Sequence, residues 1–581
     1  MDIAAANTRA ARAFVQGLAR AGVTDVCISP GSRSTPLTVA FAEQDAIRPW
    51  LHLDERSSAF FALGLARATG RAVALVCTSG TAAANFLPAV AEANLSRIPL
   101  VVCTTDRPPH LRDSGAPQTM DQVRLYGTHV RWAADLPLPS NTTADDRRFA
   151  AYGERAVRSA LGALPGPVHV NLPFDEPLLE PPDAHPGRWQ PETASFERAK
   201  VQPSPGDVRS AAQALASARR PLIVAGPETG GLPAQGIAAL AERLDAPIFA
   251  DPLSGLRTGP HDRSRVCDSY DALLRDPAAT GLAPDAIIRF GAPPTSKPLN
   301  QFLAKFPGAV QVLVDLPGGY RDPSALATHR IDGDADLVTA ALLDEIGSFA
   351  SEEGWCAAWL AADARARDAM QSASASFAEL FEGRVFVELQ RALPAGASIF
   401  ASNSMPVRDL DSFLVSDAKP LTAVSNRGAN GIDGVVSSAL GHAAGSPGPT
   451  ALVIGDIAFY HDMNGLWAAR RHGLDLTVVL VNNNGGGIFH YLPQSAHDAL
   501  FEEWFGTPPS LDFRHAADLY GARYTLADGW DTCGKALEAA REGGLHIIEV
   551  RTDRARNVEM HRQAWAAAME AGWRPQRVTA P

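Results

Sequence analysis

The 581-residue chain has few cysteines and no concentration of basic charge. Its six cysteines lack the CxxC spacing of zinc sites, so we expect neither zinc nor a disulfide framework. The net charge is −12 and no run of lysine and arginine stands out, which leaves a nucleic-acid partner little electrostatic support. No apolar run reaches the roughly 18 residues of a membrane span, and residues 1–20 lack a signal-peptide core. The expectation is a cytoplasmic protein with reduced thiols, without a nucleic-acid partner or a membrane span.

What the sequence has is enough apolar residues for several cores. Hydrophobic residues make up 46% and charged residues 20%, as in globular domains, and the length predicts about three to four domains. Continuous apolar runs alternate with alanine-rich helical segments, which indicates parallel sheets with helices on both faces. We therefore predict an α/β fold of three domains, each with a mostly parallel sheet flanked by helices. They are expected at residues 1–185, 206–348 and 357–581, with a proline-rich linker at 182–205.

The first and third predicted domains echo each other. Residues 53–55 open a helix that ends in Ala-Leu-Gly at Gly64, and a strand follows. Residues 426–428 open a segment that ends in the same triplet at Gly441, and a strand again follows. Because order and lengths match, we expect two related sheets, which suit a cofactor with two chemically different ends.

Polar residues end two successive strands in the third domain. Gly455 and Asp456 end one apolar run, and Asn483 and Gly485 follow the next. The interval accommodates one crossover helix, so both tips should share the sheet edge where open α/β sheets bind ligands. A magnesium-type cation takes few protein oxygens and keeps positions for phosphate and water. Asp456, the Asn483 amide oxygen and the Gly485 carbonyl could supply them, a pattern that closely resembles the diphosphate-anchoring motif of thiamine-diphosphate enzymes.

Two further residues match needs of that cofactor. A carboxylate whose pKa is raised by desolvation can hydrogen-bond the aminopyrimidine, and Glu55 is the candidate because residues 57–65 behind it are small or apolar. The alternative is a first-turn glutamate favoured by the helix dipole, with Asp54 as the cap. Ile432, set among glycines, is the candidate for the aliphatic wedge that bends the cofactor. Its alternative is an ordinary core isoleucine beside a turn.

Four longer motifs make the resemblance specific: residues 28–36, 105–109, 425–434 and 482–489. They look like the 2-succinyl-5-enolpyruvyl-6-hydroxy-3-cyclohexene-1-carboxylate synthase family of menaquinone biosynthesis, a branch of the thiamine-diphosphate enzymes, and the likeness spans essentially the whole chain. It implies a transferase with the thiamine-diphosphate-binding fold, which decarboxylates 2-oxoglutarate and adds the resulting succinyl-semialdehyde carbanion to isochorismate. It also implies thiamine diphosphate with Mg²⁺ or Mn²⁺ as cofactors, and a homodimer or homotetramer in which Glu55 of one chain faces Asp456 and Asn483 of another.

The resemblance also implies substrate-binding residues. Both substrates are dicarboxylates, and the planar fork of arginine suits carboxylates. Ile488 and Phe489 would be apolar walls that keep water from the reacting centre, although core residues at a helix start are the alternative. Each arginine taken singly could instead be a solvated surface charge. The 2-oxoglutarate-derived part would contact Ser404, Arg408 and Arg427, and isochorismate would contact Ser32, Arg33, Arg107, Gln118 and Lys297.

Three other functions stay open on the residues alone. Another 2-oxoacid carboligase or decarboxylase, of the acetolactate-synthase type, is the nearest, but the set of arginines argues against it because pyruvate has one carboxylate. A flavin- or nicotinamide-dependent oxidoreductase would use the glycine-rich turn at residues 225–231, a weak signal to which we assign no cofactor. A noncatalytic relative would be indifferent to Glu55→Gln.

Overall fold

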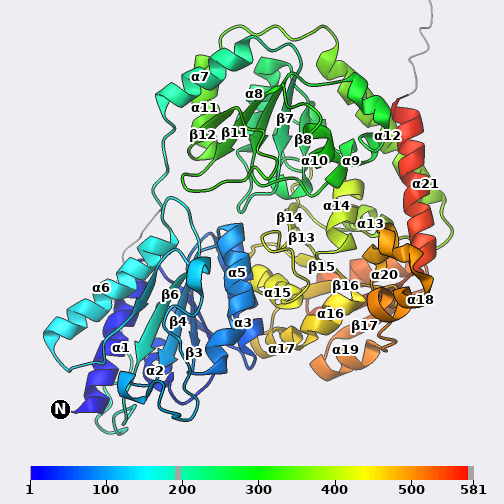
Figure 1. The fold of residues 1–581 in the computed structure, drawn as a ribbon. Coiled ribbons are helices and arrows are strands. Elements are labelled where there is room, and N and C mark those ends of the chain that lie inside the picture. Colours follow the sequence, from blue (N-terminus) through cyan, green and yellow to red (C-terminus); the bar gives the residue numbers. More distant parts are fainter. Residues whose placement is uncertain (1, 190–197, 574–581) are drawn as a thin grey trace, which may run out of the picture. The chain divides into compact units, whose positions relative to one another are not determined.

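The computed structural model describes residues 2–189 and 198–573, and it contains three six-stranded parallel sheets (Figure 1). The predicted α/β class is therefore confirmed. Parts of the predicted linker (190–197) and of the third domain (574–581) lie outside the described residues. The six cysteines are buried and free, as expected of core thiols. In the described ranges, no helix combines the length and apolar character needed to cross a membrane.

The chain forms two compact units. The first contains residues 1–199, 426–447 and 460–476, and the second contains residues 200–425, 448–459 and 477–581. The first unit holds one sheet and the second holds two. The three predicted domain ranges each contain one sheet, and their exact boundaries stay a prediction.

The first sheet has the strand order β2-β1-β3-β4-β6-β5. Its central strands β3 and β4 are buried at every residue, which explains their continuous apolar sequences. Strand order reverses between β1 and β3, the kind of position where open α/β sheets bind ligands. The strands are β1 (Asp25–Ile28), β2 (Arg48–Leu51), β3 (Val73–Cys77), β4 (Leu100–Asp106), β5 (Ala133–Asp135) and β6 (Val168–Pro173), and the helices are α1 (Ile3–Arg20), α2 (Thr35–Ala42), α3 (Glu55–Thr69), α4 (Thr81–Asn85), α5 (Leu87–Ser96) and α6 (Thr143–Ala160).

The central sheet has a different order, β12-β11-β10-β7-β8-β9. Counted from its own first strand, this is the doubly wound order known from dinucleotide-binding domains, which reverses between β7 and β10. The strands are β7 (Pro221–Ala225), β8 (Ile248–Ala250), β9 (Val266–Cys267), β10 (Ala286–Phe290), β11 (Val310–Asp315) and β12 (His329–Asp332), and the helices are α7 (Pro205–Ala216), α8 (Ala234–Leu244), α9 (Tyr270–Leu273), α10 (Lys297–Leu303) and α11 (Ala335–Glu345).

The third sheet, β14-β13-β15-β16-β18-β17, repeats the order of the first strand for strand. The predicted echo is thus present in the topology as well as in the sequence. The strands are β13 (Ser398–Ala401), β14 (Thr422–Val424), β15 (Thr450–Gly455), β16 (Leu476–Asn482), β17 (Arg523–Ala527) and β18 (Leu545–Arg551), and the α-helices are α12 (Trp355–Ser376), α13 (Arg384–Ala392), α14 (Met405–Phe413), α15 (Val435–Gly445), α16 (Asp456–Asp462), α17 (Trp467–His472), α18 (Asp498–Phe501), α19 (Arg514–Tyr520), α20 (Trp530–Ala539) and α21 (Arg554–Gly572).

The echoed glycines have a packing reason. In the first unit α3 and α15 lie against each other, and a Cβ on Gly64 would stand 1.9 Å from the Ser438 carbonyl oxygen. Reciprocally, a Cβ on Gly441 would stand 1.9 Å from the Phe61 carbonyl oxygen. Each helix therefore needs glycine at the same place, because any side chain would force the two backbones apart.

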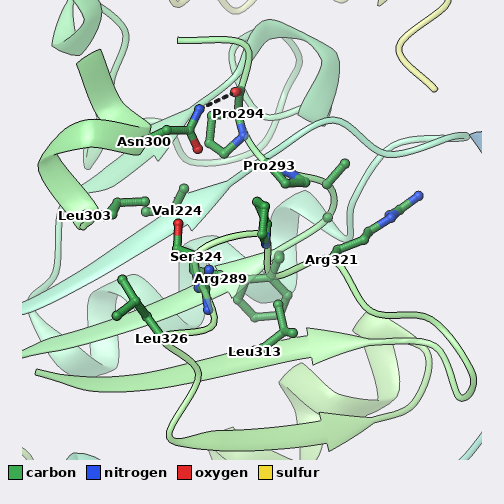
Figure 2. A pocket seen from close by; sticks show the side chains of 14 residues that line it. Val224, Arg289, Pro293, Pro294, Asn300, Leu303, Leu313, Arg321, Ser324 and Leu326 are labelled. Atoms are coloured by element: carbon green, nitrogen blue, oxygen red, sulfur yellow. Dashed lines mark hydrogen bonds between the residues drawn. The ribbon is translucent and has the colours of Figure 1, made fainter. Parts of the chain in front are cut away.

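The glycine-rich turn after β7 serves packing too. A Cβ on Gly226 would stand 1.7 Å from the Ala292 carbonyl oxygen, so the chain itself fills the point where this sheet reverses order. The neighbouring pocket offers only about 20 Å³, room for about one water molecule. Figure 2 shows Arg289 and Arg321 at this pocket; they pair with Asp322 and Glu228, respectively.

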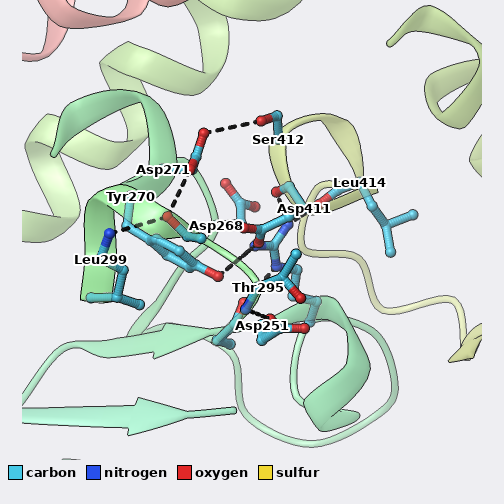
Figure 3. A network of polar contacts seen from close by, with 12 residues as sticks. Asp251, Asp268, Tyr270, Asp271, Thr295, Leu299, Asp411, Ser412 and Leu414 are labelled. Carbon is cyan, nitrogen blue, oxygen red and sulfur yellow. Dashed lines mark hydrogen bonds and ion pairs between the residues drawn. The ribbon is translucent and has the colours of Figure 1, made fainter. Parts of the chain in front are cut away.

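A buried polar network joins the central and third sheets inside the second unit (Figure 3). Arg257 is 1% exposed and forms an ion pair with Asp411 at 2.5 Å. It also donates to the carbonyl oxygens of Ala250 and Leu414, while the Tyr270 hydroxyl donates to Asp411 at 2.7 Å. Because every charged group here has a partner, the burial of the pair is compensated by hydrogen bonds.

Candidate active site

Glu55 stands at the start of α3, just after strand β2. Asp54 is the N-cap of this helix and accepts a hydrogen bond from the Ser57 amide at 2.8 Å, so the cap predicted for Asp54 is present. Glu55 itself is half-buried and has no hydrogen-bond or ion-pair partner among the described residues. Its charge reaches Cys77, whose pKa is raised first by burial and then by Glu55. The carboxylate is therefore available to a ligand, but Glu55 is also the acidic residue in the first turn of α3, so the helix-dipole alternative stays open.

Arg33 and Arg107 lie close together at the carboxyl edge of the first sheet. Arg33 is 6% exposed and donates to the Phe174 carbonyl at 2.9 Å, and it also pairs with the exposed Glu176. Arg107 donates to the Ser79 hydroxyl. Burial and then the charge of Arg33 lower the pKa of Arg107. Two adjacent guanidinium groups at a strand-end loop would attract a carboxylate ligand.

Gln118 joins this group through Ser79. Its side-chain amide donates to the Ser79 carbonyl at 3.0 Å, and the Ser79 hydroxyl donates to the Gln118 carbonyl at 3.1 Å. Ser32 is exposed in the loop after β1, directly before Arg33. The structure thus brings four of the five residues predicted to bind isochorismate to one edge of one sheet.

The loop that carries Arg427 and Ile432 is held by a buried carboxylate. Glu92 on α5 accepts hydrogen bonds from the backbone amides of Gly428 at 2.8 Å and Ala429 at 2.6 Å. Ile432 is half-buried and lies outside the fully buried core. Ile432 as the aliphatic wedge and its alternative, a core isoleucine beside a turn, both stay predictions.

Asp456 and Gly485 meet at the carboxyl edge of the third sheet. Asp456 is 2% exposed, and its carboxylate accepts hydrogen bonds from the amides of Ile457 at 2.9 Å and Gly485 at 2.8 Å. Burial raises the pKa of Asp456 to about 6, against the lowering effect of these bonds. A Cβ on Gly455 would meet nothing within 4 Å, so there is space beside this strand end.

Asn483 offers an oxygen at the same edge. Its amide nitrogen donates to Glu382 at 3.0 Å, whereas its Oδ1 atom is buried without a hydrogen-bond partner in the described part of the chain. A buried acceptor without a partner is costly, unless a ligand satisfies it. One carboxylate, one amide oxygen and a nearby glycine carbonyl fit a hard cation that keeps several waters or phosphate oxygens.

Ser404 and Arg408 lie together in the second unit. Ser404 has a φ of 70° directly before α14, and the exposed Arg408 donates to its carbonyl. Lys297 is the exposed first residue of α10, and within the described ranges no hydrogen bond or ion pair links it to them. The role of Lys297 in substrate binding stays a prediction.

Ile488 and Phe489 lie in the short 3₁₀ helix Gly487–Tyr491, which follows the metal-type loop. Neither is fully buried, and Phe489 packs against Phe505 with ring centroids 5.7 Å apart. They are partly exposed apolar side chains that follow Asn483 in the chain, and both interpretations, walls of a site and core residues at a helix start, stay predictions.

Comparison with known proteins identifies the family of the chain. The chain matches the N-terminal TPP binding domain (residues 8–125), the middle domain (185–401) and the C-terminal TPP binding domain (412–550) of thiamine pyrophosphate enzymes. It is 51% identical over 565 residues to the 2-succinyl-5-enolpyruvyl-6-hydroxy-3-cyclohexene-1-carboxylate synthase of Geobacillus kaustophilus (strain HTA426), covering 96% of both chains. The chain belongs to this synthase family.

One further synthase and one solved structure are also similar to this chain. The chain is 48% identical over 570 residues to the synthase of Chloroflexus aurantiacus (strain ATCC 29366 / DSM 635 / J-10-fl), again covering 96% of both. Among solved structures, the benzoylformate decarboxylase from Polynucleobacter necessarius aligns with a TM-score of 0.71 over 94% of this chain and 98% of that one. At 19% identity, the likeness to this decarboxylase concerns the fold alone.

Sequence reasoning missed the residues that hold the site in place. Ser79 and Gln122 organise the loop after β3, where the Gln122 side chain accepts from the Gly80 amide at 2.8 Å. Glu92 and Glu382 hold the two glycine-rich loops of the synthase. Only Ser79 stood in a motif, the Thr-Ser-Gly-Thr turn after a strand; the others lie in helical or loop sequence without any signal of their own.

Proposed function

We propose that the protein is a thiamine-diphosphate-dependent transferase that decarboxylates 2-oxoglutarate and joins the remaining four-carbon unit to isochorismate. The products are carbon dioxide and 2-succinyl-5-enolpyruvyl-6-hydroxy-3-cyclohexene-1-carboxylate, a step of menaquinone biosynthesis. The observation that carries the proposal is the close pair Arg33 and Arg107, whose two guanidinium groups suit a dicarboxylate substrate. The membership of the chain in the synthase family supports the same reaction.

The residues fit thiamine diphosphate and a divalent cation. When bound, the cofactor supplies an electron sink for the decarboxylation, and the cation, Mg²⁺ or Mn²⁺, links its diphosphate to the protein. Asp456, Asn483 and Gly485 would hold the cation, and Gly455 leaves space for the diphosphate. Ile432 would press against the cofactor between its two rings.

Glu55 would act on protons. Its carboxylate has no partner of its own among the described residues, so it can hold a proton at the ring nitrogen of the aminopyrimidine. Ile488 and Phe489 would exclude water from the reacting carbon. These are the residues to which we assign chemistry; the others bind and orient.

Substrate recognition is assigned to two groups. Ser404, Arg408 and Arg427 would hold the part derived from 2-oxoglutarate. Isochorismate would be held by Ser32, Arg33, Arg107, Gln118 and Lys297, of which Lys297 has the least support because no hydrogen bond or ion pair of the described residues links it to another predicted site residue.

The assembly and location complete the proposal. We place the protein in the cytoplasm as a homodimer that can pair into a homotetramer. Light scattering of the purified protein after gel filtration measures the assembly, and a monomer that turns over both substrates would contradict it.

One assay tests the proposed reaction. The purified protein is incubated with Mg²⁺, thiamine diphosphate and 2-oxoglutarate, with and without isochorismate, and the loss of isochorismate absorbance is followed. We expect loss only when all components are present. Turnover of pyruvate without any consumption of isochorismate would instead favour an acetolactate-synthase-type enzyme.

A further inference from the structure

A buried glutamate outside the predicted motifs contacts the cation loop. Glu382 lies just before α13 and is 3% exposed. One oxygen of its carboxylate accepts hydrogen bonds from the Asn483 side-chain nitrogen at 3.0 Å and from the Thr552 hydroxyl at 2.8 Å. The Thr552 amide in turn donates to the Asn482 carbonyl at 3.1 Å. Glu382 therefore sits where the ends of β16 and β18 meet.

The direction of the Asn483 amide depends on this contact. An asparagine side chain has an oxygen that only accepts and a nitrogen that only donates, and rotation by half a turn exchanges them. The Glu382 oxygen that faces Asn483 accepts its hydrogen bond, so it selects the arrangement in which the asparagine nitrogen faces Glu382. The oxygen must then point away, and it is this Oδ1 atom that is buried without a partner in the described residues.

No donor from the described residues bonds to the Asn483 Oδ1 atom. Gly487 lies so close that a Cβ there would stand 2.7 Å from the Asn483 nitrogen, which limits how the side chain can move. Gly485 next along the loop donates its amide to Asp456. Asn483 Oδ1 thus has no hydrogen-bond donor among the described residues, and the Asp456 carboxylate accepts from two backbone amides; the charge of Arg554 also acts on Asp456 and lowers its pKa.

We propose that Glu382 is a positioning residue, which fixes the Asn483 amide so that Oδ1 serves as a ligand of the divalent cation. This inference rests on the proposed function, because it assigns a task to the cation site described there. Glu382 does not touch the cation, the cofactor or the substrate; it acts through Asn483. Residues of this kind typically change metal affinity by about 10- to 100-fold.

The first test replaces the carboxylate of Glu382 with a side-chain amide. Gln at position 382 keeps size and packing but can present either an oxygen or an amide group to Asn483, so it no longer selects one orientation. We expect Glu382→Gln to lower the Mg²⁺ affinity by about 10-fold or more. Calorimetric titration of thiamine-diphosphate binding at varied Mg²⁺ concentrations measures this affinity. Asn483→Asp alone should also weaken binding, because two carboxylates would then face each other.

The double variant is decisive. In Glu382→Gln combined with Asn483→Asp, both outer atoms of residue 483 are oxygens, and the new Gln amide can donate to one of them. We expect Mg²⁺ affinity to recover to within about threefold of the starting protein, a rescue that a merely structural role of Glu382 would not produce. Double-variant affinity no better than that of the weaker single variant would overturn the proposal.

A matched control separates folding from positioning. Glu388 is buried on α13, pairs with Arg384 and Arg391, and has no contact with Asn483. Glu388→Gln should lower the melting temperature yet leave Mg²⁺ affinity within about twofold. Equal loss of affinity in Glu388→Gln and Glu382→Gln would refute a specific role of Glu382.

Two outcomes keep the hypotheses apart. If the unaltered protein binds thiamine diphosphate without any dependence on Mg²⁺, both the proposed cation site and the role of Glu382 fail. If it shows that dependence and Glu382→Gln shows the same affinity, only the positioning role fails. Should the variant not fold, a crystal structure of the unaltered protein with Mg²⁺ and thiamine diphosphate decides: Oδ1 of Asn483 on the cation and its nitrogen on Glu382 supports the inference, and a Glu382 turned away from Asn483 overturns it.

Discussion

The central and third sheets both carry glycines where their strand order reverses or their strands end, but the glycines do different things. At the central sheet, Gly226 lets the backbone of Ala292 approach so closely that the crevice is filled by the chain. At the third sheet, the strand ends carry Asp456 and Asn483, and a Cβ on Gly455 would find open space. A glycine-rich turn after a strand therefore indicates that another group can approach the backbone closely. Only the contacts show whether that group is another backbone segment or a ligand.

The first sheet sharpens this comparison. It shares its strand order with the third sheet, and each has a polar group without a hydrogen-bond partner among the described residues: the half-buried Glu55 carboxylate in one and the buried Asn483 Oδ1 atom in the other. The central sheet pairs its charged groups instead, as with Arg289 and Asp322. We therefore expect the reaction to depend on the first and third sheets, which share one strand order. We expect the central sheet to contribute to stability.

The largest expected effect is at the first sheet. Glu55→Gln removes the proton-holding group, and general acid–base groups contribute about 10²- to 10⁴-fold, so kcat should fall by that factor. Thiamine-diphosphate binding, measured by calorimetry, should stay. The control is Glu154→Gln, which alters an exposed glutamate paired with Arg158 on α6 and should keep full turnover. An undiminished kcat in Glu55→Gln would contradict the expected role of the first sheet in the reaction.

The next effect concerns the third sheet. Asp456→Asn removes the only carboxylate of the proposed cation set, and the apparent affinity for Mg²⁺ should fall by about 100-fold or more, since even outer contacts of a metal site are worth about 10- to 100-fold. Titration of activity with Mg²⁺ measures it. Asp528→Asn, at an exposed carboxylate that accepts from Thr532, is the matched control and should leave the titration curve in place. An unchanged Mg²⁺ requirement in Asp456→Asn would contradict the assignment.

At the central sheet we expect a change in the free energy of unfolding instead of a change in kcat. In Gly226→Ala the new methyl group would overlap the Ala292 carbonyl, and overpacking of this kind costs about 1–3 kcal/mol of unfolding free energy. Denaturant unfolding measures it, and kcat per folded molecule should not change. Gly308→Ala, where a Cβ would meet nothing within 4 Å, should cost much less. A large loss of kcat at full stability in Gly226→Ala would mean that the central crevice takes part in the reaction.

The smallest effect separates cap from catalyst at the start of α3. Asp54→Ala removes the bond to the Ser57 amide, and loss of an N-cap costs about 1 kcal/mol. Thermal unfolding should register this loss, whereas kcat should stay within about threefold of the starting value. If instead Asp54→Ala abolished turnover while Glu55→Gln did not, the two neighbouring carboxylates would have to exchange roles.

Much of the fold and part of the site could be predicted because their signals are local. Continuous apolar runs indicated buried parallel strands, and the polar residues after β15 and β16 indicated a shared edge, where Asp456 and Gly485 do meet. Arg33, Arg107 and Gln118 were implied together by the family resemblance; in the structure Arg107 and Gln118 both bond to Ser79, and the charge of Arg33 acts on Arg107. Their individual roles stay predictions.

The supporting residues could not be predicted, for a physical reason. Glu92 and Glu382 act on loops far away in the sequence, and a buried glutamate in a helix or loop looks like any surface glutamate until its partners are known. Lys297 came from the family resemblance alone, and no hydrogen bond or ion pair of the described residues links it to another predicted site residue.

The sequence by itself determined the α/β class, the repeated order of helices and strands, and which polar residues end the strands, because each of these follows from patterns a few residues long. The tertiary structure alone decided which glycines admit backbone and which leave space, and which carboxylates are paired and which are available. Those properties depend on atoms brought within a few ångströms from distant parts of the chain, and no local pattern encodes such a distance.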